Sequence, residues 1–341
     1  MAEGAPHARG ERVGRALADH VARSVAALHG VRERAGMSEH ELTARLTPLV
    51  AATDAALPAR MAYARGLAAG AGVPFADVFA VNALEEAFHD DPAERCSSLA
   101  VATPGGTLLA HAEQWATCEL GNCAVVVERP DDGAPWVVSP TVAACLPVVG
   151  LNEHGGAFGV DSLVAADDGD GIPRVFAARE ALDARDPGDL LGRARLAGRA
   201  GGYGTVAAFA GGHVAVVEQT AARAELVAGA AAHTNHYLHP ELAAIGRAAS
   251  ATSTSRLEHL RRLAGSLPAE PGPEDLMRLL GSHDASPEPV CAHGPDPSDP
   301  DGTIILYAFV ADVERRRLWV CEGPPCTAAF EEIDLRWLGA S

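Results

Sequence analysis

The spacing of apolar residues along the chain changes near residue 90. Before that point apolar side chains recur every three or four positions, as in the series from Val13 to Leu28. This is the spacing of one helix face, and we expect Gly30 to end the helix that it predicts. The spacing predicts a helical N-terminal segment over residues 1–95.

Two helix starts stand out within this segment. Ser38 and Glu41 have the Ser-x-x-Glu form of a capping box. Pro74 is placed to open another helix, which the apolar pattern extends to Phe88.

Short β-favouring runs follow the turn signal Asp90-Asp91-Pro92. The predicted strands are 96–103, 107–113, 123–128, 142–149, 156–163, 205–210, 213–219, 303–310 and 317–321, and the predicted helices are 174–184, 189–200, 252–264 and 273–280. Pro104-Gly105-Gly106 joins the first two strands as a hairpin, and residues 287–302 are expected to form a loop. Helices first, then antiparallel hairpins broken by a helical block, predict an α+β fold with two packed sheets between helical layers.

The charge of the chain restricts its partners. Acidic residues number 45 against 27 basic ones, which gives a formal net charge of −18. This charge opposes binding to nucleic acid and to anionic membranes, because both depend on basic patches. No segment reaches the roughly 20 consecutive apolar residues of a membrane span, and Met1 to Glu11 has no apolar run of the signal-peptide kind. We therefore expect a cytoplasmic protein with a small-molecule partner, and the sequence leaves the oligomeric state open.

The seven cysteines form an odd set without a Cys-x-x-Cys pair, so a disulfide framework is not expected. Cys291-x-His293 is the pattern nearest to a metal-binding pair, but no second pair follows at the spacing of zinc sites. We expect no metal and no bound organic cofactor.

Cys96 is the candidate nucleophile. It stands at the start of a β-run, after an acidic loop and directly before Ser97 and Ser98. A thiol there can attack a carbonyl carbon. If the chain were cut before Cys96, the freed α-amine, with a pKa of about 8, would be a general base beside the sulfur. The alternative is a small buried apolar residue.

Polar side chains gather at the end of the strand expected to pair with the one that Cys96 begins. This strand carries His111, Glu113 and Gln114. Glu113 and Gln114 are placed to orient a substrate or the amine of the nucleophile, and a solvated strand end is the alternative.

A second polar segment, residues 233–239, holds three histidines and Asn235 after an apolar run. An asparagine at such a strand end can donate its amide N–H to a developing oxyanion. A helix cap or turn is the alternative for Asn235.

These motifs, in this order, resemble the acyl-CoA:6-aminopenicillanate acyltransferase family of autoproteolytic cysteine acyltransferases and amidohydrolases, which are N-terminal-nucleophile hydrolases. The resemblance rests on Cys96-Ser97-Ser98, Leu108 to Trp115, Gly150 to Gly156, Ile172-Pro173-Arg174, Thr234 to Leu238, Ser255-Arg256-Leu257, Cys291-Ala292-His293, Leu318-Trp319-Val320 and Gly323-Pro324-Pro325-Cys326. It extends from Cys96 nearly to the C-terminus.

The resemblance implies a four-layer αββα sandwich made as a precursor that cuts itself before the cysteine, here at the Arg95–Cys96 bond. Residues 1–95 and 96–341 would remain together as one compact domain. The Cys96 thiol would take an acyl group from an amide or thioester and pass it to water or to an amine. Asn235 matches the oxyanion residue of the family.

The chain departs from the family at the expected site. Where the family has Asn-Trp-Asp or Asn-Glu-Asp, whose aspartate contacts the amine of the nucleophile, this chain has Ala112-Glu113-Gln114. Gln114 can accept a hydrogen bond from an ammonium but has no charge to hold it. The family's Asn-Ser-Leu is Asp161-Ser162-Leu163 here, and its Ile-Cys-Arg-His is Val290-Cys291-Ala292-His293.

Two interpretations follow. In the first, which the retained Cys96, Glu113 and Asn235 favour, the chain is an acyltransferase or amide hydrolase retuned for another acyl donor or acceptor, for instance a coenzyme A or carrier thioester in specialised metabolism. It assigns catalysis to Cys96, Asn235, Gln114 and Glu113, substrate contacts to His111, Asp161, His236 and His293, and self-cleavage to Arg95 and Cys96. In the second, the chain is an unprocessed relative that binds a ligand without turning it over.

Overall fold

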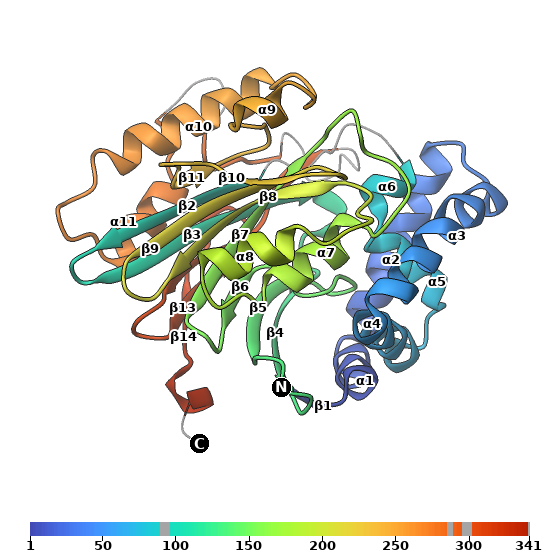
Figure 1. Cartoon of the computed structure of the whole chain (residues 1–341). Coiled ribbons are helices and arrows are strands. Elements are labelled where there is room, and N and C mark those ends of the chain that lie inside the picture. The colour runs from blue at the N-terminus through green and yellow to red at the C-terminus, as the bar shows by residue number, and fades with distance from the viewer. Residues whose placement is uncertain (89–95, 285–288, 295–301, 340–341) are drawn as a thin grey trace.

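Two antiparallel sheets form the centre of the molecule (Figure 1). The computed structural model describes residues 1–88, 96–284, 289–294 and 302–339. Within these ranges the first sheet has eight strands, in the spatial order β1 (Ala2–Gly4), β4 (Cys123–Pro130), β5 (Val137–Val142), β6 (Gly150–Asn152), β7 (Gly156–Leu163), β8 (Gly202–Phe209), β9 (His213–Gln219) and β10 (Ala224–Leu226). The second has six, in the order β11 (Ala232–His233), β2 (Ser97–Thr103), β3 (Gly106–Ala116), β12 (Thr303–Asp312), β13 (Arg317–Glu322) and β14 (Glu331–Asp334). Only β1, which runs parallel to β4, breaks the antiparallel pattern among these described strands.

Helices cover the outer face of each sheet. α10 (Ala251–Ala264) and α11 (Pro273–Leu280) pack on the six-stranded sheet, and α7 (Arg174–Ala181) and α8 (Pro187–Ala194) pack on the eight-stranded sheet (Figure 1). The remaining short elements of this part are α9 (Pro240–Ala243) and the 3₁₀ turns η1 (Thr117–Glu119) and η2 (Arg336–Gly339). The αββα sandwich that we expected is confirmed.

The core between the sheets is built by alternate residues of facing strands, since successive side chains of a strand point to opposite faces. β2 and β3 lie against β7 and β8. Apolar side chains from both sheets are fully buried there, among them Leu109, Val206, Leu306 and Phe309. A side chain on an inward position of β2 or β3 is therefore removed from solvent unless a cavity reaches it.

In the described residues before β2, six helices pack together beside the sandwich, and α1 contacts β1 and β4 (Figure 1). They are α1 (Pro6–Ala16), α2 (Ala18–Arg34), α3 (Glu39–Ala56), α4 (Pro58–Ala71), α5 (Phe75–Val81) and α6 (Leu84–Phe88). The capping box of Ser38 and Glu41 is confirmed at the start of α3. The expectation for Gly30 was wrong: α2 continues through it, because a helix tolerates an interior glycine at a cost of about 1 kcal/mol. The chain turns instead at Gly36, whose φ is +63°.

Asn82 accounts for two further differences from the sequence prediction. The helix predicted from Pro74 to Phe88 breaks at Asn82, and the strand predicted over 142–149 ends at Val142. The Asn82 side chain donates to the carbonyl oxygen of Ala144 at 2.9 Å and accepts from the Leu146 N–H at 2.8 Å. The Ala144 carbonyl and the Leu146 N–H, which a strand would pair with a neighbouring strand, therefore bond to the Asn82 side chain instead.

Glycines permit a very close contact between α1 and α4. A Cβ atom added at Gly10 would lie 2.1 Å from the Tyr63 carbonyl oxygen, and one added at Gly66 would lie 2.1 Å from the His7 carbonyl oxygen. Any larger residue at either position would force the two helices apart.

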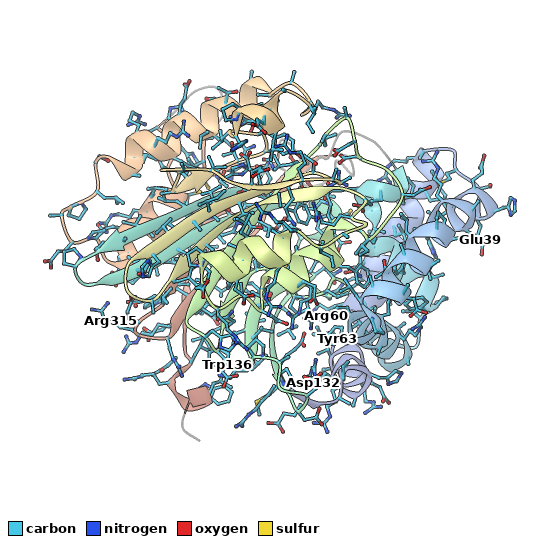
Figure 2. All side chains as sticks on the ribbon, viewed as in Figure 1. Glu39, Arg60, Tyr63, Asp132, Trp136 and Arg315 are labelled. Atoms are coloured by element: carbon cyan, nitrogen blue, oxygen red, sulfur yellow. The ribbon has the colours of Figure 1, made fainter. Side chains whose placement is uncertain are left out.

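Buried ion pairs connect these helices to the sandwich. Arg9 of α1 pairs with Glu128 of β4 at 3.2 Å, and both side chains are 1% exposed. Arg60 of α4, labelled with Tyr63 in Figure 2, pairs with Glu180 at 2.5 Å and also with Asp183, both from the region of α7. The N-terminal helices are thus held to the sandwich by buried charges as well as by apolar packing.

Within the described ranges, no single helix has the length and apolar composition of a membrane span. α4 and α5 reach that length only jointly, across a bend of 119°.

Candidate active site

The Cys96 side chain is buried between the sheets, with 2% of the residue exposed. Cys96 directly precedes β2, which pairs with β3 so that Ser97 faces Ala112 and Ser98 faces His111. This register brings the thiol to Glu113, and Cys96 Sγ donates to Glu113 Oε1 at 3.1 Å. The two residues that the sequence singled out on neighbouring strands are therefore in contact.

The second oxygen of Glu113 has two neighbours of its own. His111 Nε2 lies 3.2 Å from Glu113 Oε2, and the Tyr307 hydroxyl donates to the same oxygen at 3.4 Å. His111 Nδ1 lies 2.9 Å from Ser98 Oγ. Burial and the charge of Glu113 hold the pKa of Tyr307 well above its ordinary value, so the hydroxyl keeps its proton. The carboxylate that faces the thiol is thus fixed from its far side.

Gln114 points away from this cluster, as the period-2 alternation of a strand requires for the neighbour of Glu113. Its Nε2 donates to Thr303 Oγ1 at 3.0 Å. The structure therefore does not bring Gln114 to Cys96. The carboxylate at the thiol belongs to Glu113, one position earlier than the motif comparison led us to expect.

Arg256, from α10, joins Cys96 to Asn235. Its Nη1 donates to the Cys96 carbonyl oxygen at 2.6 Å and to Ser97 Oγ at 2.9 Å, and its Nη2 donates to Asn235 Oδ1 at 2.8 Å. A guanidinium only donates hydrogen bonds, so the Asn235 amide must turn its oxygen toward Arg256 and its NH₂ away. The NH₂ group reaches the Ser162 carbonyl oxygen at 3.2 Å. Arg256 was not among the site residues expected from the sequence, although its Ser-Arg-Leu motif was the available signal.

A buried trio of charges holds the segment that carries Asn235. His233 Nδ1 lies 3.2 Å from Asp161 Oδ2, and His233 Nε2 lies 3.1 Å from Glu218 Oε1, with all three side chains 0% exposed. Burial alone would lower the pKa of His233, but the hydrogen bonds and charges of the two carboxylates outweigh it and raise the pKa to about 9. Glu218 also accepts the backbone N–H groups of Leu238 at 2.6 Å and of His239 at 3.0 Å.

The four residues expected to contact substrate do not form an open surface beside Cys96. His111 and Asp161 are 0% exposed and engaged in the hydrogen bonds described above. His236 Nδ1 lies 2.8 Å from Ser253 Oγ, and burial lowers the pKa of this imidazole to about 4. His293 belongs to a separate cluster near α11. Arg95, the other residue of the expected cleavage bond, lies outside the described residues.

A cavity of about 50 Å³ opens beside the thiol. Its polar lining comes from Cys96, Glu113, Thr141, Ser162, Tyr203 and Tyr307, and its apolar lining includes Trp115, Val142, Leu146, Val148, Val160 and Val175. This volume holds a few water molecules, since one water needs roughly 10–15 Å³ by the same kind of measure. Most of this lining could not be predicted from the sequence, because it comes from strands and turns far apart in the chain.

The N-terminal helices reach the wall of this cavity through α6. The hydroxyl of Tyr203 donates to Glu85 Oε1 at 2.9 Å, and that of Ser162 donates to the same oxygen at 3.2 Å. Removal of α6 would therefore change the wall opposite the thiol.

The donor atoms of Cys96, His111 and Glu113 lie within 4.8 Å of one another, which is compatible with a metal ion as well as with a hydrogen-bond relay. The Ser98 and Tyr307 contacts described above account for the orientation of His111 and Glu113 without a metal.

The fold and the thiol–carboxylate contact define the chain as an αββα sandwich with a candidate cysteine site between its sheets. A family model described as Acyl-coenzyme A:6-aminopenicillanic acid acyl-transferase matches residues 101–326, and the chain belongs to this family. The description of this family names acyl transfer as its chemistry. Cys96 precedes the matched range by five positions, so the case for Cys96 depends on the contacts of the thiol.

Solved structures with a similar fold include penicillin V acylase from Agrobacterium tumefaciens, at 15% identity, with 71% of this chain and 86% of that chain covered and a TM-score of 0.48. A variant of conjugated bile acid hydrolase from Clostridium perfringens is 12% identical, with 71% and 93% covered and a TM-score of 0.45. Among curated proteins, none matches the chain.

Proposed function

We propose that this chain breaks amide or thioester bonds by acyl transfer to the thiol of Cys96, and that water or an amine then takes the acyl group. The observation that carries the proposal is the 3.1 Å hydrogen bond from Cys96 Sγ to Glu113 Oε1 at the wall of a buried cavity. The thiol has a proton acceptor on one side and room for a reacting carbonyl on the other. Membership of an acyl-transferase family supports the same chemistry.

A carboxylate is in general a weaker base for a thiol than an amine is. A free glutamic acid has a pKa of about 4.3 and a free cysteine one of about 8.5, so proton transfer between them is uphill by roughly four units. A free α-amine has a pKa of about 8 and matches a thiol much better. We therefore propose that the amine freed at Cys96 is the general base, and that Glu113 holds the thiol and this amine in place.

Freeing that amine requires cleavage of the Arg95–Cys96 bond. The Cys96 sulfur would attack the Arg95 carbonyl carbon, so that the C–N bond breaks, a thioester forms and the nitrogen takes a proton. Water would then hydrolyse the thioester, leaving a carboxylate at Arg95 and a thiol at Cys96. Glu113 supplies a carboxylate at the sulfur in place of the aspartate that the family motif puts at Gln114.

The fragment released by this cleavage would stay bound. Its helices contribute the buried Arg9–Glu128 and Arg60–Asp183 ion pairs and the close α1–α4 contact. Glu85 of the same fragment contacts Tyr203 and Ser162 at the cavity wall. We expect the two fragments to copurify and to separate only on unfolding.

Asn235 is the proposed oxyanion donor. Arg256 holds the amide with its NH₂ directed toward the Ser162 side, where the cavity wall lies. A preorganised donor of this kind stabilises the charge that develops on the carbonyl oxygen. Because Arg256 also holds the Cys96 carbonyl oxygen, nucleophile and donor share one rigid support.

The cavity lining favours a small-molecule acyl group with an apolar portion beside the thiol, since four valines, a leucine and a tryptophan are among the residues that line it. Both amides and thioesters fit the proposal, including thioesters of coenzyme A or of a carrier protein. The acceptor decides between a hydrolase and a transferase.

Two measurements test the proposal. Intact-mass analysis of the purified protein should show fragments of residues 1–95 and 96–341, and Cys96→Ala should leave one uncut chain. Turnover of acyl-anilide and acyl-CoA panels should occur with wild type and with the control Cys118→Ser, whose cysteine is exposed, but not with Cys96→Ala. An uncut wild-type chain that neither turns over nor becomes acylated at Cys96 would instead favour the ligand-binding relative.

A further inference from the structure

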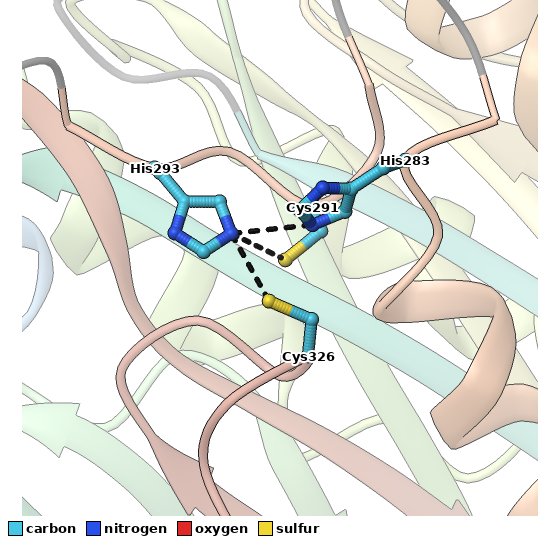
Figure 3. A group of neighbouring side chains, drawn as sticks. All are labelled: His283, Cys291, His293 and Cys326. Carbon is cyan, nitrogen blue, oxygen red and sulfur yellow. Dashed lines mark hydrogen bonds between the residues drawn. The ribbon is translucent and has the colours of Figure 1, made fainter.

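Four metal-type donors meet at the outer surface, near the end of α11. They are His283, Cys291, His293 and Cys326, and Figure 3 shows their side chains directed toward a common centre. His283 follows α11, Cys291 and His293 lie in the segment 289–294, and Cys326 lies in the turn after β13. The donor atoms of all four lie within 4.8 Å of one another.

Hydrogen bonding cannot account for this convergence. His293 Nε2 lies 3.2 Å from His283 Nε2, 3.0 Å from Cys326 Sγ and 3.7 Å from Cys291 Sγ. A single imidazole nitrogen has either one proton or one lone pair, so it makes one good hydrogen bond and not three. A cation at the common centre would instead use one lone pair from each of the four donors.

The spacing of the donors matches a tetrahedral zinc site. Zinc binds sulfur at about 2.3 Å and imidazole nitrogen at about 2.0–2.1 Å, which puts neighbouring donors of a tetrahedron about 3.3–3.8 Å apart. The three separations from His293 Nε2, 3.0, 3.2 and 3.7 Å, lie close to this range. A set of two thiolates and two imidazoles also binds zinc in preference to metals that favour oxygen ligands.

The backbone around the four donors is held by bonds that need no metal. The Cys291 N–H donates to the Ser282 carbonyl oxygen at 3.2 Å, and the Ile305 N–H donates to the Ala292 carbonyl oxygen at 3.3 Å. The turn that carries Cys326 is closed by the Thr327 N–H on the Pro324 carbonyl oxygen at 3.0 Å. The donors are therefore preorganised by strands and turns on three separate segments.

We propose that His283, Cys291, His293 and Cys326 bind one zinc ion, which joins the end of α11 to the turn after β13. The site is distinct from the Cys96 cavity, and its lining shares no residue with that cavity. With four protein donors it is a closed, structural site, without the open position that a catalytic zinc keeps for water. The ion would fix the outer helical layer against the edge of the smaller sheet.

The spacing of the donors explains why the sequence does not predict this site. No second metal-type pair stands at a fixed distance from Cys291-x-His293. The structure supplies one partner ten positions before His293 and another 33 positions after it. Only the return of the chain through β12 and β13 brings Cys326 to the other three.

Metal analysis of the untagged whole chain, purified without chelator from zinc-supplemented medium, tests the proposal. We expect about one zinc per chain, and Co²⁺ exchange should produce the visible absorption of a tetrahedral thiolate–cobalt site. Cys291→Ser with Cys326→Ser, and separately His283→Ala at an exposed position, should lower the zinc affinity by at least about 100-fold. Cys118→Ser and Cys96→Ala should retain the metal.

Three outcomes would overturn the zinc site: no zinc in the folded wild-type chain after reconstitution, zinc that survives in the double cysteine variant, or zinc lost with Cys96→Ala. A Cys291–Cys326 disulfide, seen as a mass two hydrogens lower without metal, would also overturn it. His283→Ala separates loss of metal from loss of fold, because its circular dichroism should match that of wild type.

Discussion

Cysteine and histidine come together twice in this chain, in surroundings of opposite kinds. At Cys96 the sulfur is buried between two sheets, faces one carboxylate and borders a cavity. Near the end of α11 the buried Cys291 and the exposed Cys326 face two imidazoles, and the four donors converge on one centre. The comparison teaches that residue type alone does not decide the chemistry of a thiol. A thiol with one proton acceptor and a cavity beside it is suited to act as a nucleophile. A thiol that converges with three other donor atoms is suited to bind a metal.

The largest expected effect comes from Cys96→Ala. Removal of the nucleophile should lower acyl-transfer turnover by at least about 1000-fold, as with other enzymes that react through a covalent intermediate. The same variant should keep its zinc. Turnover and metal content should both be measured on one preparation of this variant. If Cys96→Ala lost zinc as well as turnover, the two cysteine sites would not be independent.

Asn235→Ala should lower kcat by about 100- to 1000-fold with little change in KM, because the amide is expected to stabilise the transition state more than the ground state. Saturation kinetics with one acyl thioester give both constants. A rise in KM at unchanged kcat would make Asn235 a substrate-binding residue and not an oxyanion donor.

The next effect separates Glu113 from Gln114. Glu113→Gln removes the charge that holds the thiol and the amine and should lower the rate by about 10- to 100-fold, the loss expected for a hydrogen bond to a charged group. Gln114→Ala removes a neutral contact with Thr303 and should cost less than about tenfold. Steady-state rates of the two variants, compared at equal folded fraction, decide the assignment. Equal losses would return the role to the position that the motif comparison indicated.

The smallest expected effect concerns stability and pH. The pKa of His233 rises from 6.5 to about 9 on folding, so its contribution is complete below pH 6.5 and is lost as pH rises to 9. The shift corresponds to stability on the order of 3 kcal/mol. Urea unfolding at pH 6 and pH 9 should show this decline in wild type, and His233→Gln should lack it. A wild-type stability that stays level over this range contradicts the charged trio.

The sequence predicted the layers of the fold because most of its signals are local. The capping box at Ser38 and the β-favouring runs of β7 and β9 depend only on neighbouring residues, and these elements formed as expected. The strand predicted over 142–149 failed because Asn82, some 60 positions earlier, bonds to its backbone. A single sequence without the fold contains no pattern for such a contact.

Some residues of the candidate site could likewise be predicted from local sequence patterns, and others could not. Cys96 and Glu113 were identified from their places on a predicted hairpin, where register alone brings them together. Arg256 and Tyr307 reach the site from a helix and a strand more than 150 positions further along the chain. Their roles follow from the pairing of β12 with β3 and from the packing of α10 on the six-stranded sheet, and the apolar pattern of the sequence specifies neither arrangement.

The most direct test of the central claim is peptide mapping after brief reaction with a reactive acyl ester, such as a p-nitrophenyl ester. The account predicts one acyl group per chain, carried on the sulfur of Cys96 in a peptide that begins at Cys96, and no such modification in Cys96→Ala. An acyl group found instead on Cys118 or on another residue, with equal labelling of Cys96→Ala, would contradict it.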